Sequence, residues 1–358
     1  MGKIMVVTFA YNAEKTIERA VHSILSQSYG NWEYHLFNNG SQDDTQKIIS
    51  RLCDSDSRII SHEIEENTLL AGGIYVPDVL KATDCEWFCW IDADDEYKPD
   101  FFIKMLDFVK SNRLDAAACG YDRIDGFTGK LIKRKSNDGN IFLLERQDFL
   151  DKFIQYRGFT IGLWGKFISI PVMADILDPQ RVLDKWENFS DTQITLKSFR
   201  LAKRVGIYGE ALYKYYIYPK SLSNSLVVGR YEMDMSYYRA LRSYLLYYGE
   251  ISKLNEDFLC AVLLSLLDET VPMVFNSELA VVDKLEILSK IFNDANVAEM
   301  FNREADPQFH NLAGRSDFLN NVMDRLSAQA REFSAVQADA AKLAEILKRL
   351  QDGHYNDK

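Results

Sequence analysis

Residues 87–96, with the sequence WFCWIDADDE, decide the fold of the first part of this chain. The apolar run from Trp87 to Ile91 is predicted to form a buried strand, and it ends abruptly in a cluster of acidic side chains. In an open α/β sheet, ligands bind at the carboxyl ends of the strands. The acidic cluster therefore lies where a ligand site is expected.

Upstream of this strand, short apolar runs alternate with helical patterns. Strands are predicted at residues 4–8, 34–37 and 58–61, and helices at residues 14–26 and 43–52. Such alternation is typical of a parallel α/β domain. The acidic cluster thus follows two α/β units.

The character of the sequence changes near Ser225, beyond which Pro and Gly are scarce and helical periodicity dominates. We therefore predict two domains, an α/β domain at residues 1–224 and a helical domain at residues 225–358. Residues 317–351 repeat apolar side chains at the a/d spacing of a coiled coil. The same stripe also fits a terminal helix that packs on its own domain. Both a homo-oligomer through this helix and intramolecular packing stay open.

Composition excludes several classes of protein. The 358 residues contain 42 Lys and Arg against 53 Asp and Glu, a net charge of −11 that disfavours binding to nucleic acid. The longest strongly apolar stretch, residues 258–267, is shorter than the roughly 20 residues that a membrane span needs. We expect no membrane span or signal peptide. The five cysteines lack paired metal-ligand spacing and fit reduced thiols in a cytoplasmic protein, either in solution or peripheral to the inner membrane face.

The acidic cluster has the chemistry of a metal site. Closely spaced carboxylates such as Asp92, Asp94 and Asp95 repel one another, and a hard divalent cation stabilises them by taking their oxygens as ligands. Such a cation would in turn attract a phosphate. The alternative interpretation is a solvated acidic turn before a helix at residues 99–110.

Six segments of the chain occur in an order that is typical of one enzyme family. They are VVTFAYN at residues 6–12, SQSYGNWE at 26–33, NNGSQDDT at 38–45, DADD at 92–95, LWGKF at 163–167, and SDT at 190–192 followed by AKRV at 202–205. With these segments the chain resembles the inverting family 2 glycosyltransferases of the GT-A fold, which use nucleotide-sugar donors. The resemblance covers residues 4–225. It implies a Rossmann-like nucleotide-sugar-binding α/β domain, followed here by the α-helical domain.

The resemblance implies roles for the acidic residues. Asp94 would coordinate Mn²⁺ or Mg²⁺ together with the donor diphosphate, Asp92 would lie near the ribose and the metal, and Asp95 would support both. Asp191 would be the general base that takes the proton from the acceptor hydroxyl. The alternative for Asp191 is a helix N-cap at the start of the helical stretch that follows it.

The resemblance also implies residues that contact the substrates. The opening strand and turn, at Thr8, Phe9, Ala10 and Tyr11, would hold the nucleotide together with Asn38.

On the acceptor side, the resemblance implies Trp164 and Lys166. Lys214 and Lys220 are the nearest cations available to the diphosphate, and the alternative is that they are ordinary surface lysines.

The chain also departs from the family pattern. Asn38 stands where the family usually has an Asp that accepts a hydrogen bond from uracil. Tyr75-Val76-Pro77 occupies the neighbourhood of an Arg-Asn pair, Ser190 replaces a Glu, and Tyr216 and Tyr218 fall where basic residues are usual. Asn38 puts the selectivity for the base in doubt, and the departures together motivate the second function given below.

Two functions follow. The first is a metal-dependent inverting glycosyltransferase, of hexosyl or N-acetylhexosaminyl type. It would move a sugar from a nucleoside diphosphate, with UDP expected, to a hydroxyl of a glycan, lipid-linked or protein acceptor in bacterial surface-polysaccharide assembly. The alternative is a catalytically degenerate nucleotide- or glycan-binding module with a helical assembly domain. A nucleotidyltransferase is disfavoured because no Gly-rich, basic phosphate loop lies near the N-terminus.

Overall fold

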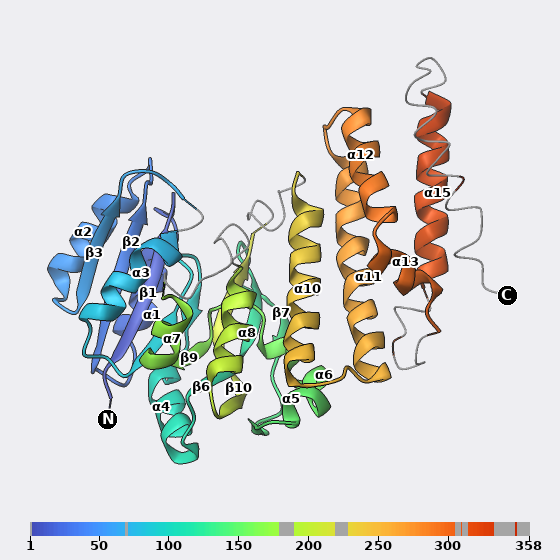
Figure 1. The fold of residues 1–358 in the computed structure, drawn as a ribbon. Helices are drawn as coiled ribbons and strands as arrows, with labels where there is room; N and C mark the ends of the chain where they lie inside the picture. The colour runs from blue at the N-terminus through green and yellow to red at the C-terminus, as the bar shows by residue number, and fades with distance from the viewer. Residues whose placement is uncertain are drawn as a thin grey trace. The chain divides into compact units, whose positions relative to one another are not determined.

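The computed structural model describes residues 2–68, 71–178, 190–218, 228–304, 309, 314–332 and 348. The chain divides into two compact units, residues 1–221 and residues 222–358. The boundary predicted after residue 224 falls among residues 219–227, which lie outside the described part. Each unit is described separately below (Figure 1).

The first unit is built on one ten-stranded sheet with the order β3-β2-β1-β4-β9-β6-β10-β5; β7 pairs with β6 and β8 pairs with β10. The strands are β1 (Ile4–Ala10), β2 (Trp32–Asn39), β3 (Ile59–Ile64), β4 (Trp87–Trp90), β5 (Glu96–Tyr97), β6 (Ala116–Asp125), β7 (Leu131–Lys135), β8 (Phe142–Leu144), β9 (Lys166–Ser169) and β10 (Val205–Ile217). β1 is parallel to β2 and β4, whereas β9 runs antiparallel between β4 and β6. The predicted α/β class is confirmed, in a mixed rather than a wholly parallel sheet.

Helices connect these strands. They are α1 (Ile17–Leu25), α2 (Thr45–Ser55), α3 (Ala71–Ala82), α4 (Phe101–Asn112), α5 (Asp148–Asp151), α6 (Phe153–Tyr156), α7 (Ile170–Ile176) and α8 (Asp191–Leu201), with a 3₁₀ turn at Arg157–Phe159. The predicted helices at residues 14–26, 43–52 and 99–110 correspond to α1, α2 and α4 and are confirmed. Tyr75-Val76-Pro77 lies in α3.

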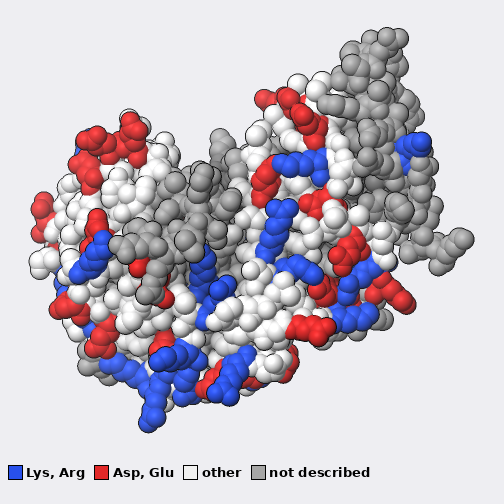
Figure 2. Space-filling view, viewed as in Figure 1, with Lys and Arg blue, Asp and Glu red and all other residues white. Residues whose placement is uncertain are grey.

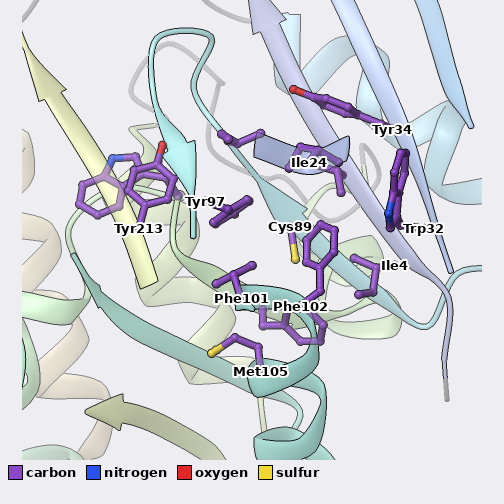
Figure 3. Close-up of a cluster of buried hydrophobic side chains, with 14 of the residues drawn as sticks. Ile4, Ile24, Trp32, Tyr34, Cys89, Tyr97, Phe101, Phe102, Met105 and Tyr213 are labelled. Carbon is purple, nitrogen blue, oxygen red and sulfur yellow. The ribbon is translucent and has the colours of Figure 1, made fainter. Parts of the chain in front are cut away.

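A hydrophobic core of this unit lies between the sheet and helices α1, α2 and α4 (Figure 3). Alternate residues of β1, Ile4 and Val6, point into it, because successive side chains of a strand point to opposite faces. α4 adds Phe101 and Phe102, both fully buried, and the ring of Phe101 stacks on Tyr97 with 3.8 Å between centroids. Burying each such side chain contributes about 1.5–3 kcal/mol. This core fixes the position of β4 and of the acidic residues that follow it.

The two signs of charge are distributed over the surface. On the face shown in Figure 2, acidic side chains gather over the β2–β3 end of the first unit, and basic side chains gather near α4. Both signs of charge are therefore present on this face, as expected from a chain with 42 basic and 53 acidic residues.

The second unit is helical. Its described helices are α10 (Arg230–Tyr248), α11 (Lys253–Asn276), α12 (Val281–Phe292), α13 (Ala295–Asn302) and α15 (Arg315–Glu332). α11 packs against each of the other four. Among the described residues, α11 is the one helix that is long and apolar enough to cross a membrane, and 61% of its apolar window is buried. Such burial is typical of a core helix.

The predicted heptad stripe begins in α15. Its first members are buried, with Leu319, Val322 and Leu326 at most 7% exposed, and α15 packs on α11. This part of the stripe therefore contributes to the core of the unit. Most of residues 333–358 lie outside the described part, so self-association through this helix stays a prediction.

Phe101→Ala should destabilise the first unit by about 3–5 kcal/mol, because it leaves a cavity in a closely packed core. Phe127, which is 78% exposed, provides the matched control, and Phe127→Ala should change the free energy of unfolding by less than about 1 kcal/mol. Urea unfolding of both variants measures the difference. Equal losses would contradict the position of the core.

Candidate active site

The acidic cluster lies at the carboxyl edge of the sheet. The N–H of Ile91 donates to the carbonyl of Val7 at 3.1 Å, so the chain leaves β4 beside the end of β1. It then turns back into β5, which pairs antiparallel with Tyr213 and Lys214 of β10. The cluster is therefore held between β1 and β10, two strands that are far apart in the sequence.

Asp95 ties the cluster to β10. Its side chain is fully buried and accepts hydrogen bonds from the hydroxyl of Tyr213 at 2.6 Å and from the N–H of Tyr216 at 2.8 Å. Burial, followed by the charges of Asp92 and Asp94, raises the pKa of Asp95 well above its usual value. Each oxygen of Asp95 already has a partner, so this residue positions the loop.

Asp92 and Asp94 offer the more accessible carboxylates. Asp92 accepts a hydrogen bond from the indole N–H of Trp90 at 2.9 Å. Burial and then the negative charges of Asp191 and Asp94 raise the pKa of Asp92 to about 8. Burial also raises the pKa of Asp94. The structure thus brings Asp191 close to the cluster, so that three carboxylates lie near one another at this edge of the sheet.

Asp191 is the first residue of α8, and it does not cap that helix. The cap is Ser190, whose side chain accepts from the N–H of Gln193. The alternative interpretation of Asp191 as the N-cap is therefore wrong. Although Asp191 keeps exposed surface, desolvation by the surrounding protein raises its pKa, and Lys166 opposes that shift. Within the part of the chain that the structure describes, no group forms a hydrogen bond with its carboxylate.

A loop before β9 fixes the start of α8. Gly162 donates its N–H to the hydroxyl of Thr192 at 3.3 Å, and its carbonyl accepts from the hydroxyl of Thr195 at 2.7 Å. Lys166 braces the same loop, since its ammonium donates to the carbonyls of Ile161 at 3.1 Å and Trp164 at 2.8 Å. These bonds determine where Asp191 lies.

Trp164 and Lys166 were expected on the acceptor side, and the structure buries both. Trp164 is 6% exposed, and its ring stacks on those of Tyr213 and Tyr215. Lys166 is 2% exposed, and burial lowers the pKa of its ammonium to about 7. Because packing covers both side chains, they support the site from inside the protein. They present no open ring or ammonium to an acceptor.

The expected nucleotide residues divide into buried and exposed groups. The hydroxyl of Thr8 is fully buried; it donates to the carbonyl of Ile91 at 2.6 Å and lies 2.9 Å from the hydroxyl of Tyr34. Ala10 is likewise fully buried, whereas Tyr11 is 46% exposed. Thr8 therefore holds β1 to β4, and of these three side chains only that of Tyr11 is open to a ligand.

Two further aromatic and polar positions line this edge. The ring of Phe9 stacks on Phe37 and Trp90 with centroid distances of 4.4 Å and 5.3 Å. Asn38 is 3% exposed, and its side-chain oxygen accepts from the N–H of Ser41 at 3.2 Å. That bond uses one of the two lone pairs of the oxygen that was expected to accept a hydrogen bond from the base.

Of the two expected cations, Lys214 is already paired, because its ammonium lies 2.8 Å from the carboxylate of Glu96. Lys220 lies outside the described residues.

Arg19 of α1 is a cation that sequence reasoning missed. Its guanidinium donates to the backbone carbonyl of Asp94 and, at 3.1 Å, to the hydroxyl of Tyr218. It also lies 3.4 Å from Glu96 and 3.8 Å above the ring of Tyr216. In the sequence, Arg19 falls outside the apolar stripe of a helix and resembles an ordinary surface residue. Only the tertiary contact with the loop after β4 distinguishes it.

Comparison with known proteins agrees with this arrangement. Residues 5–168 match the family described as Glycosyl transferase family 2. This part of the first unit is therefore similar to the family 2 glycosyltransferases. The TarS 1–349 structure from S. aureus, in complex with UDP-GlcNAc, aligns with 99% of this chain and 93% of its own at a TM-score of 0.62 and 15% identity. This similarity confirms the predicted GT-A-like fold with its C-terminal helices.

Two bacterial glycosyltransferases are among the sequence relatives of the chain. TuaG of Bacillus subtilis, named as a candidate teichuronic acid biosynthesis glycosyltransferase, is 30% identical over 118 residues, which cover 33% of this chain and 46% of TuaG. The Escherichia coli enzyme WfgD, named as a UDP-Glc:α-D-GlcNAc-diphosphoundecaprenol β-1,3-glucosyltransferase, is 23% identical over 131 residues, which cover 36% of this chain and 50% of WfgD. The chain therefore spans no more than half the length of these relatives.

Arg19→Ala should loosen the loop at residues 91–98. The variant loses charge-assisted hydrogen bonds that are worth about 1.5–3 kcal/mol, so amide hydrogen exchange in this loop should accelerate by about tenfold or more. Arg51→Ala is the control, since Arg51 pairs with Glu18 at an exposed site on α2. Mass spectrometry of the loop peptides measures the exchange, and equal rates in the two variants would refute this role for Arg19.

Proposed function

We propose that this chain is a metal-dependent inverting glycosyltransferase that moves a hexosyl or N-acetylhexosaminyl group from a nucleoside-diphosphate sugar to an acceptor hydroxyl. One observation carries the proposal: Asp92, Asp94 and Asp191 converge at the carboxyl edge of the sheet in a unit similar to the family 2 glycosyltransferases. Asp191 comes from a distant part of the chain, and its carboxylate is not used for capping. An acid or base next to a cation site is what glycosyl transfer requires.

The residues fit a divalent cation. Asp92 and Asp94 are poorly solvated, and the charge of Asp94 helps to raise the pKa of Asp92; a hard cation with oxygen ligands stabilises such carboxylates. Asp94 would hold Mn²⁺ or Mg²⁺, with Asp92 beside it. When bound, the cation would supply positive charge that neutralises the negative charge developing on the leaving diphosphate. The side chain of Asp95 anchors the loop to Tyr213, and Arg19 holds the loop by donating to the backbone carbonyl of Asp94.

The proposed transfer is a single displacement in which Asp191 acts as the base. The acceptor hydroxyl forms a bond to the anomeric carbon as the bond to the phosphate oxygen breaks, and the nucleoside diphosphate leaves with that electron pair. Asp191 takes the proton of the hydroxyl. Since attack comes from the face opposite the leaving group, the anomeric configuration inverts.

The comparisons support a donor and an acceptor class. UDP-GlcNAc is the ligand in the TarS complex whose fold this chain shares, which favours a UDP-sugar donor. The name of WfgD specifies a lipid-diphosphate-linked acceptor, and the name of TuaG specifies teichuronic acid biosynthesis. We therefore propose a role in bacterial surface-polysaccharide assembly, with a glycan or lipid-linked glycan as the acceptor and the cytoplasm as the compartment.

Asp94→Ala should lose the metal-dependent part of donor binding, because Asp94 is the proposed ligand. A thermal-shift screen of UDP, GDP, CDP and dTDP, each with and without Mn²⁺, measures this binding, since ligands of the folded state raise the melting temperature. Asp107→Asn, at an exposed position on α4, is the control and should behave like the wild type. If Asp94→Ala kept the full Mn²⁺-dependent shift, the metal assignment would be wrong.

Asp191→Asn should bind donor and metal like the wild type but lose about 10²–10⁴-fold in transfer rate, as expected for removal of a general base. Release of UDP in the presence of acceptor glycans measures the rate. Wild-type turnover by this variant would remove Asp191 from the mechanism. Nucleotide binding by the wild type without turnover on any acceptor would instead support the degenerate binding module.

The transfer rate should also fall at low pH. Desolvation raises the pKa of Asp191, so this carboxylate accepts a proton, and stops acting as a base, at a pH above the ordinary value of about 3.9. The profile of kcat/KM against pH, at saturating Mn²⁺, should therefore show an acid limb above that value. A rate that stays constant down to pH 4 would contradict the proposed environment of Asp191.

A further inference from the structure

The hairpin of β6 and β7 presents an unusual surface. Residues 127–134, with the sequence FTGKLIKR, are all exposed. Among them are three large apolar side chains: Phe127 is 78% exposed, Leu131 53% and Ile132 55%. Figure 1 shows β7 as a short strand of the first unit, and it pairs only with β6 among the described strands. Several large apolar side chains exposed on one short hairpin mark an interaction surface.

The same hairpin is basic in an acidic chain. Within residues 123–134 it carries Lys130, Lys133 and Arg134, with Arg123 opposite Lys133 on β6, against one acidic side chain, that of Asp125. Arg134 is paired with Asp122 at 2.5 Å. For Lys130, Lys133 and Arg123, the described part of the chain contains no salt-bridge partner. Three cations without a salt bridge in the described part of the chain therefore lie on the same hairpin as the apolar side chains, whereas the whole chain has a net charge of −11.

The tip of the hairpin is held in one conformation. The carboxylate of Asp125 accepts from the N–H groups of Phe127 at 3.0 Å and Thr128 at 2.7 Å and from the hydroxyl of Thr128 at 2.9 Å. The N–H of Asp125 donates to the carbonyl of Lys130 at 2.9 Å, which closes the turn. The exposed side chains are therefore presented by a formed turn, and little ordering is needed when they bind.

The hairpin also lies beside the candidate active site. The N–H of Gly126 donates to the carbonyl of Ile217 at 3.0 Å, and the ring of Phe127 packs edge-on against Tyr218 at 5.8 Å. Tyr218 accepts a hydrogen bond from Arg19, which in turn donates to the carbonyl of Asp94. A surface bound by the tip would consequently lie next to the edge of the sheet that carries the acidic cluster.

We propose that this hairpin, defined as residues 123–134, docks the protein on the surface of an anionic lipid bilayer. Cations attract the headgroups of anionic lipids, and apolar side chains on the same element insert at the boundary between headgroups and acyl chains. A soluble polyanion would need the lysines but would leave Phe127, Leu131 and Ile132 in water. The combination of the two kinds of side chain therefore favours a bilayer as the partner.

This inference goes beyond the proposed function and does not depend on it. Docking needs neither donor, metal nor acceptor, so it can be measured with the resting protein. Should both hold, the bilayer would bring a lipid-linked acceptor to the edge of the sheet where Asp94 and Asp191 lie.

Co-sedimentation of the full chain with vesicles tests the proposal. One set contains phosphatidylglycerol and phosphatidylcholine, and the other contains phosphatidylcholine alone. The wild type should bind the anionic vesicles and not the neutral ones. Lys130→Glu/Lys133→Glu should weaken that binding by about 20-fold or more, since each cation near an anionic surface contributes about fivefold. Phe127→Ser/Ile132→Ser should weaken it by about tenfold or more, through the lost apolar insertion.

Matched controls change the same properties elsewhere. Lys47→Glu/Lys81→Glu reverses two exposed charges on α2 and α3, and Ile60→Ser removes an exposed apolar side chain on β3, the edge strand at the end of the sheet opposite β10. Both variants should bind like the wild type apart from a small uniform loss. Circular dichroism and nucleotide thermal shift verify that each variant is folded.

Three results would overturn the proposal. The first is that the wild type fails to bind anionic vesicles. The second is that the hairpin variants bind as the controls do. The third is that heparin or polyphosphate competes fully with the vesicles while Phe127→Ser/Ile132→Ser binds normally, which would identify the hairpin as a site for a soluble polyanion. A failure of catalysis with intact vesicle binding would concern the proposed function alone.

Discussion

The site depends on the two hydrogen bonds that Asp95 accepts from β10. The acidic loop follows β4, a strand of four residues, and it carries like charges that repel one another. Without an anchor, opening toward water would lower the free energy of such a loop, because the carboxylates are better solvated there. The hydroxyl of Tyr213 and the N–H of Tyr216 hold Asp95 in the core instead. Asp92 and Asp94 are thereby kept at the edge of the sheet in a poorly solvated state.

A second set of contacts brings the distant carboxylate to this loop. Lys166 braces the turn around Gly162 from inside the protein, and Gly162 bonds to two threonines in the first turns of α8. Asp191 stands at the start of that helix. Since Ser190 performs the capping, the carboxylate of Asp191 is available for chemistry. The same residues that were expected to touch an acceptor, Trp164 and Lys166, thus act through the backbone that they support.

The residues expected to form the site differ in whether their side chains are buried in the protein or open to a ligand. Thr8, Ala10 and Asn38 are buried and bonded or packed within the protein: the hydroxyl of Thr8 ties β1 to the end of β4, and the side chain of Asn38 bonds to the turn after β2. Tyr11, Asp92 and Asp94 remain more open. Arg19 places a positive charge next to the acidic loop. Its guanidinium contacts the backbone of the loop and the tyrosines at the end of β10.

By itself, the sequence determined the fold class, the order of the first strands and helices, and the acidic cluster. These depend on local periodicity and on the position of Asp92–Asp95 directly after an apolar strand, which are properties of neighbouring residues. It could not determine the roles of Arg19, Lys166 and Trp164, because a helix face or a short motif does not specify which distant backbone it will contact. The antiparallel position of β9 and the approach of Asp191 to Asp92 are both products of long-range packing. Tertiary structure decided them because desolvation and charge repulsion act through space, between groups that the sequence separates.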